Sequence, residues 1–188
     1  SEVFLTMNIH VFFIVCPMVF LAGIVDSIAG GGGLISLPAY LMAGLPPHMA
    51  VATNKLSSSC GTTVSAFRYL QNRCVSLPLV PSTILAALAG SSIGARLVLA
   101  LDERYIKGML FIVLPVTAFF VLRKKSPLDT QGPALPLKKQ LLIATLAAFI
   151  IGAYDGFYGP GTGTFLVLIL TGLARMDVRT ASGNTKCI

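Results

Sequence analysis

Apolar residues in this chain fall in long uninterrupted runs and do not alternate with polar ones. The stretches without a charged residue are 3–25, 27–54, 74–95, 108–122, 140–154 and 156–174. A helix needs roughly 20 mostly apolar residues to cross a bilayer, with about 17 as the lower limit, and several stretches meet this alone or with a few flanking residues. Because no period-two alternation accompanies them, the runs predict membrane helices and not the strands of a barrel.

The predicted helices lie near residues 8–28, 34–44, 50–68, 77–101, 105–122, 138–157 and 163–173, with a further helix that starts near 179. Two of them, 34–44 and 163–173, are too short to span comfortably, because about 11 residues at 1.5 Å each cover only half of a core of about 30 Å. The first run lacks a basic start, and Asp26 follows it where a signal peptide would have a small-residue cleavage site. We therefore predict an all-α, polytopic transmembrane helix bundle with broken or re-entrant helices.

Composition agrees with a membrane environment. The chain is 55% hydrophobic and 11% charged, whereas soluble domains carry about 25% charged residues. The net charge of +7 does not indicate a nucleic-acid partner, because the basic residues stand at the ends of apolar runs. Arg68 and Arg73 make one loop basic, the loop 102–107 is neutral, and 123–139 is strongly basic. Basic loops stay in the cytoplasm, so we expect the first and third loops there and the second outside.

Two segments of the chain resemble each other, which indicates an internal duplication. A shift of 129 residues pairs four residues of the first copy with four of the second, namely Gly23, Asp26, Gly30 and Gly32 with Gly152, Asp155, Gly159 and Gly161. Lys55 pairs with Lys186 at a shift of 131. The expected organisation is a first repeat at 1–122, a cytoplasmic basic linker at 123–137 and an incomplete second repeat at 138–188, in a complete protein that would end near residue 250, roughly. If 34–44 crosses the membrane the copies are inverted, and if it is re-entrant they are parallel; its length slightly favours the second.

Glycine-rich interruptions follow the two aspartates. Four consecutive glycines, Gly30 to Gly33, should break a helix, since each costs about 1 kcal/mol relative to alanine. The amide groups freed at the next helix start form a site for an anion, and interruptions at matching positions in two halves point to a transporter's substrate site. The alternative is that these glycines only let helices pack closely; the recurrence beside an acid favours a site.

Lys55 and Lys186 lie in largely uncharged sequence, where a lysine costs about 2.5–3.5 kcal/mol at mid-membrane. Each needs a partner, either Asp26 or Asp155 or an anionic substrate, unless its side chain reaches the interface near a helix end. Arg96 either balances an acid or sits at a helix end. The candidate substrate-binding residues are Gly30, Gly31, Gly32, Gly33, Thr53, Asn54, Lys55, Gly159, Gly161, Asn184 and Lys186. Asp26 and Asp155 are the candidate proton carriers, because loss of water favours the neutral form of a carboxyl group.

Nothing in the sequence predicts a cofactor or a metal site. Cys16, Cys60, Cys74 and Cys187 show no metal-ligand spacing, and we interpret them as packing residues. The two histidines stand alone, which argues against an enzyme. An intramembrane enzyme and a membrane structural or assembly protein remain as alternatives to a transporter.

Three motifs carry a family resemblance: the DSIAGGGG motif at 26–33, ATNKLS at 52–57 and YDGFYGPG at 154–161. With them the chain closely resembles the sulfite exporter TauE/SafE family of bacterial membrane transporters. The resemblance implies a duplicated bundle of about eight helices in the bacterial inner membrane that moves sulfite, sulfonate or related small anions, generally outward. The expected mechanism is alternating access around a midplane site, with coupling to a proton. The sequence does not indicate the oligomeric state.

Overall fold

The computed structural model describes residues 9–123 and 135–188, and all regular elements in these two ranges are helices. They are α1 (Ile9–Ala29), α2 (Gly33–Met42), α3 (Pro47–Gln71), α4 (Val80–Leu99), α5 (Glu103–Arg123), α6 (Leu137–Phe157), α7 (Thr162–Gly172) and α8 (Val178–Cys187). The predicted all-α bundle is confirmed. The bounds differ most at α3, which begins three residues before its predicted start because Pro47 suits the first turn of a helix. Most of the linker 123–137 lies outside the described residues.

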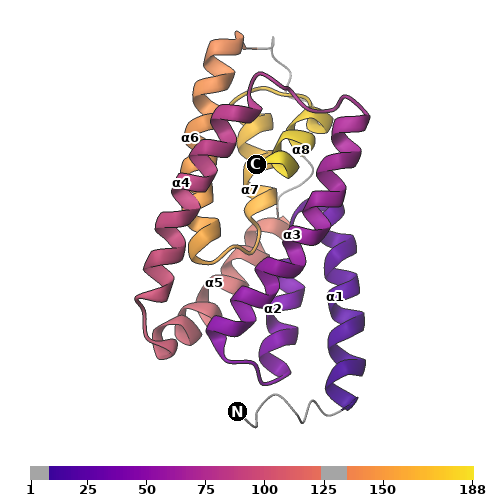
Figure 1. Cartoon of the computed structure of the whole chain (residues 1–188), viewed down its shortest axis with the longest axis vertical. Coiled ribbons are helices and arrows are strands. Elements are labelled where there is room, and N and C mark those ends of the chain that lie inside the picture. The colour runs from indigo at the N-terminus through magenta and orange to yellow at the C-terminus, as the bar shows by residue number, and fades with distance from the viewer. Residues whose placement is uncertain (1–8, 124–134) are drawn as a thin grey trace.

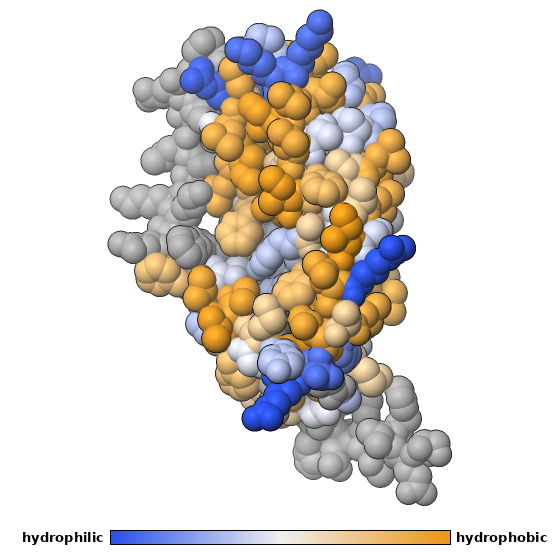
Figure 2. Space-filling model, turned by 90° about the vertical axis from the view of Figure 1, so that its left-hand side faces the viewer, coloured by the Kyte–Doolittle hydropathy of each residue, from blue (hydrophilic) through white to orange (hydrophobic). Residues whose placement is uncertain are grey.

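The outer surface of the bundle is apolar. Helices α4 and α6 are each long and apolar enough to cross a membrane, yet only 22% of the apolar window of either is buried inside the protein. Figure 2 shows apolar side chains over much of the visible face, strongly hydrophilic ones near its upper and lower ends, and a hydrophilic side chain that projects from its right-hand edge near mid-height. This distribution suits a surface whose middle contacts lipid and whose ends contact water.

The two copies of the repeat run in opposite directions. In Figure 1, α1 and α2 form a hairpin that starts and ends at the lower end, whereas α6 and α7 form one at the upper end. Helix α8, the counterpart of the start of α3, instead lies against the end of α3: a Cβ on Gly183 would come within 3.2 Å of the Tyr69 ring. The preference for parallel copies is therefore wrong. The prediction failed because α1 does not reach the opposite end of the molecule but turns back together with α2 (Figure 1). Three helices, α3 to α5, therefore separate the start of the first copy from the start of the second.

Glycines hold α4 and α6 side by side. A Cβ added to Gly152 would lie 2.9 Å from the carbonyl oxygen of Ala87, and one added to Gly156 would lie 2.7 Å from the Cα of Ser91. Residue numbers rise together along this contact, so the two helices are parallel. Small residues in membrane helices allow such close approach of backbones, and here the packing interpretation of glycine applies.

The four cysteines differ in burial. All four are free, and Cys74 and Cys187 are half-buried. Cys16 and Cys60 are exposed among the described residues, so for these two a packing role stays a prediction.

Candidate substrate site

The two helix breaks meet in the middle of the molecule. Gly30, Gly159 and Gly161 have φ angles of 72°, 94° and 82°, a region that glycine adopts at little cost. A Cβ on Gly30 would lie 2.7 Å from the Cα of Gly163, so the break after α1 touches the first turn of α7. Glycine is therefore required at these breaks for two reasons: each turn has a positive φ angle, and the backbones of the two turns are in close contact.

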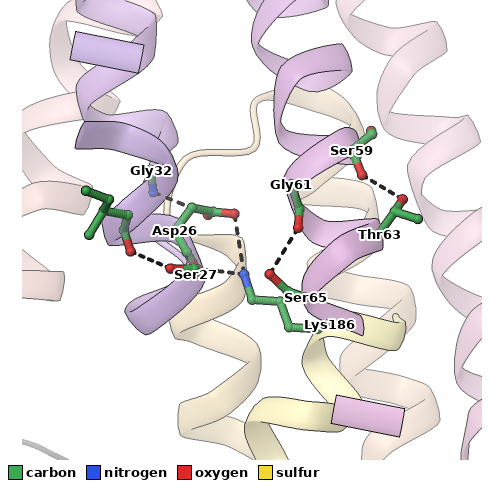
Figure 3. A network of polar contacts seen from close by, with 9 residues as sticks. Asp26, Ser27, Gly32, Ser59, Gly61, Thr63, Ser65 and Lys186 are labelled. Atoms are coloured by element: carbon green, nitrogen blue, oxygen red, sulfur yellow. Dashed lines mark hydrogen bonds and ion pairs between the residues drawn. The ribbon is translucent and has the colours of Figure 1, made fainter. Parts of the chain in front are cut away.

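Two ion pairs cross between the copies at these breaks. Lys186 Nζ of the second copy lies 3.4 Å from Asp26 Oδ2 of the first and donates to the Asp26 carbonyl oxygen at 2.7 Å (Figure 3). Lys55 Nζ of the first copy lies 2.6 Å from Asp155 Oδ2 of the second. Each lysine thus finds a carboxylate inside the molecule, and each copy supplies the partner that the other needs.

The two pairs differ in their surroundings. The side chains of Lys186 and Asp26 are 9% and 20% exposed, and the Asp26 carboxylate also accepts a hydrogen bond from the Gly32 amide at 3.3 Å. The side chains of Lys55 and Asp155 are 31% and 38% exposed. The first pair is a buried connection between the copies, whereas the second is accessible from the adjoining cavity.

A cavity of about 260 Å³ adjoins both ion pairs and both breaks. Hydroxyl side chains complete its wall, from Ser58, Ser59, Thr62, Ser91, Thr162 and Thr185. Thr185 stands out among them, because its Oγ1 is buried without a hydrogen-bond partner while the whole residue is only 8% exposed. A buried hydroxyl without a partner costs about 1–3 kcal/mol, and a polar solute in the cavity would supply one.

Most of the predicted site residues line this cavity. They are Asp26, Gly30, Gly33, Asn54, Lys55, Asp155, Gly159, Gly161 and Lys186. Gly31, Gly32, Thr53 and Asn184 are not part of its lining.

Two of the predicted residues outside the cavity lining make hydrogen bonds that hold the local structure. Gly32 donates its amide to the Asp26 carboxylate, as described above. The Asn184 side chain donates to the Thr180 carbonyl oxygen at 2.8 Å and accepts from the Ser76 amide at 3.3 Å. It therefore ties α8 to the loop between α3 and α4, and the expectation that it faces the substrate finds no support in this geometry. Asn54, which lines the cavity, accepts a hydrogen bond from the Ser36 hydroxyl.

The predicted site residues included none of the six hydroxyl side chains in the cavity wall. A signal existed for Thr185, because the shift of 131 that pairs the lysines also pairs it with Asn54. None existed for Ser91, which reaches the cavity only because α4 packs against α6. Arg96 is exposed in the last turn of α4, as the helix-end interpretation required.

These features define a class of protein. Inverted copies, helices interrupted at matching positions, and charged side chains gathered where the interruptions meet are the architecture of secondary membrane transporters. The comparison with known sequences agrees: the model of the family described as "Sulfite exporter TauE/SafE" matches residues 15–188. The chain belongs to this family.

Curated relatives carry compatible names. A protein of Haemophilus influenzae named "Probable membrane transporter protein" is 35% identical over 168 residues, which is 89% of this chain and 65% of that protein. A relative from Sinorhizobium sp is 36% identical over 169 residues, or 89% and 63%. YfcA of Escherichia coli is 35% identical over 170 residues, or 89% and 62%. The chain thus spans less than two thirds of these relatives, and no solved structure matches it.

Proposed function

We propose that this chain belongs to a transporter of small sulfur-containing or organic anions, such as sulfite or a sulfonate. It exports them by alternating access and couples their movement to protons. The observation that carries this proposal is the cavity of about 260 Å³ at the meeting point of two helix breaks and two crossed ion pairs. An enzymatic role is not expected.

The positive potential for an anion comes from the half-helices. The two lysines are balanced by the two aspartates, so the pairs alone give no net charge. Helices α2 and α7, however, begin at Gly33 and Thr162, which both line the cavity. A helix N-terminus carries the equivalent of about half a positive charge, and two of them directed at one cavity favour a negatively charged solute.

Proton coupling follows from the ion pairs. The ionised Asp155 carboxylate forms an ion pair with the Lys55 ammonium. A proton on Asp155 would break this pair and leave the Lys55 ammonium free to bind an incoming anion. Proton and anion would then bind together, and each would raise the affinity for the other by the same factor. The more accessible pair suits this exchange, since both of its side chains are about one third exposed.

Alternating access follows from inversion. In an inverted pair of copies, an exchange of conformation between the copies converts a site open to one side into a site open to the other. The crossed pairs lie where the copies meet, and the α1–α2 and α6–α7 hairpins approach that point from opposite ends. Movement of one hairpin relative to the other would therefore open the cavity to one side at a time.

The membrane and its orientation are part of the proposal. We assign the protein to the bacterial inner membrane, with lipid as its surroundings and the basic segment 123–139 in the cytoplasm. The loop between α3 and α4 lies at the same end of the molecule as the start of α6, as this assignment requires. A cysteine placed in 123–139 of a variant without the four native cysteines should react with an impermeant maleimide in inverted vesicles and not in intact cells.

A flux measurement tests the proposal. The complete protein, reconstituted in inverted vesicles, should take up radiolabelled sulfite, and Lys55→Met should reduce uptake at least tenfold at unchanged membrane insertion. Arg96→Met is the matched control, because Arg96 is exposed and away from the cavity lining. Normal flux in the Lys55→Met variant would remove this lysine from the mechanism, and no flux of any sulfur anion or carboxylate in the unmodified protein would reject the substrate class.

A further inference from the structure

The face of α6 that contacts α4 has a counterpart on α1. On α6 the contact is made through Gly152 and Gly156, where α4 approaches so closely that an added Cβ would meet the backbone of Ala87 or Ser91. Thr145, seven residues or about two turns before Gly152, donates to the Ser82 hydroxyl of α4 at 3.2 Å. This face is therefore covered along much of its length.

The same positions on α1 are uncovered. The shift of 129 residues takes Thr145, Gly152 and Gly156 to Cys16, Gly23 and Ser27. All three are exposed, and a Cβ on Gly23 would meet no atom within 4 Å. Sequence and fold repeat between the copies, yet only one of the two related faces has a neighbouring helix among the described residues.

We propose that this face of α1, formed by Cys16, Gly23 and Ser27, docks the second copy's counterpart of α4. The curated relatives leave room for such a helix, because about a third of each lies outside the matched region. In an inverted duplication each packing contact of one copy recurs in the other, so a helix that covers α6 from the first copy implies one that covers α1 from the second. This inference rests on packing and does not depend on what the protein transports.

A groove next to this face fits a helix better than lipid. A space of about 70 Å³ lies between α1 and α3, and small residues line much of it, among them Gly23, Ser27, Ser57, Gly61 and Ser65. In Figure 3, Ser27 lies on α1 and Gly61 and Ser65 lie on α3, and the Ser27 hydroxyl donates to the Ile24 carbonyl oxygen of its own helix. Surfaces built from glycine and serine let a helix backbone approach and offer it hydrogen bonds. The docked helix should itself carry small residues three or four positions apart, as α4 does at Ala87, Gly90, Ser91 and Gly94.

Reassembly from two pieces tests the proposal. The 188-residue chain is expressed together with a tagged segment of the Haemophilus influenzae relative, the part outside its matched region, and purified through the tag. The chain should co-purify, and a Gly23→Leu substitution should lower its yield at least tenfold. Gly108→Leu is the matched control, because Gly108 is also an exposed helical glycine with no atom within 4 Å of an added Cβ.

A second readout avoids any effect of leucine on folding. In a chain whose four native cysteines are replaced by serine, Gly23→Cys should react with a lipid-soluble maleimide, and the segment should slow this reaction at least tenfold. Gly108→Cys should react equally fast with and without the segment. Failure of the unmodified chain to co-purify, or equal reactivity of Gly23→Cys in both preparations, would overturn the proposal and leave this face to lipid.

Discussion

The two crossed ion pairs should contribute unequally to stability, and single substitutions can measure the difference. Lys186→Met removes the cation from the more buried pair, in which the lysine side chain is 9% exposed. Lys55→Met does the same to the pair whose side chains are 31% and 38% exposed. Methionine keeps the length and apolar character of the lysine stem, so the loss of charge dominates the comparison.

The magnitudes follow from the surroundings. Breaking a buried ion pair costs about 3–5 kcal/mol, because the remaining charge keeps no adequate partner. Asp26 would retain only the 3.3 Å hydrogen bond from the Gly32 amide, so we expect a loss near 3 kcal/mol for Lys186→Met. An accessible pair is worth about 1 kcal/mol or less, which is the loss expected for Lys55→Met. Adding Asp26→Asn to Lys186→Met should recover most of the larger loss, because no charge is then left unpaired.

The assay is reversible unfolding of the 188-residue chain in mixed micelles, with increasing mole fraction of sodium dodecyl sulfate and circular dichroism as the signal. The free energy of unfolding is compared for the unmodified chain, both single variants and the double variant. Equal losses in the two single variants would refute the distinction between a buried and an accessible pair. A double variant no more stable than Lys186→Met would refute the claim that the unpaired carboxylate causes the loss.

Three further substitutions and one control variant test other parts of the structure. Gly156→Ala should lower the free energy of unfolding by about 1–3 kcal/mol, since its Cβ would push α4 away, whereas Gly108→Ala, in open space, should leave it unchanged or raise it. Thr185→Val should leave stability unchanged or raised by about 1 kcal/mol, because it removes a hydroxyl without a partner, and lower anion flux if that hydroxyl contacts the solute. Asp177→Ala should cost about 1 kcal/mol by removing the cap that accepts from the Thr180 amide. Burial acts to raise the pKa of Asp177, but the hydrogen bonds from Thr180 outweigh it and the net pKa is lowered. Its contribution is therefore present above the unfolded pKa of about 3.9 and is lost as the pH falls through the folded value, which unfolding at a series of pH values would reveal.

Much of the architecture could be predicted because lipid imposes simple rules. Mostly apolar runs long enough to span a bilayer, such as 77–101 and 138–157, were recognisable as helices, and glycine runs marked where helices end. The direction of the second copy could not be predicted, since it depends on whether α1 crosses the membrane or turns back. Length alone does not decide this, because α1 has 21 residues and is long enough for either.

The candidate site was predictable only in part for a similar reason. A lysine in apolar sequence signals that a partner exists, and Lys55 and Lys186 indeed lie in ion pairs. Which aspartate each lysine takes is set by tertiary packing, and the sequence holds no trace of that choice. Ser91 belongs to the cavity for geometric reasons as well, because it has no counterpart or motif that distinguishes it from other hydroxyl residues. Thr162, in contrast, pairs with Gly33 at the shift of 129.

The exchange of partners between the copies has a consequence for how such a protein can arise. A molecule built from the first copy alone would hold Asp26 and Lys55 without the carboxylate and ammonium that they contact here. It could neutralise both only by joining a second molecule inserted upside down in the same bilayer. Duplication and fusion of one gene would make that opposed insertion permanent, and from then on the two halves could diverge, as the unlike exposure of their ion pairs illustrates.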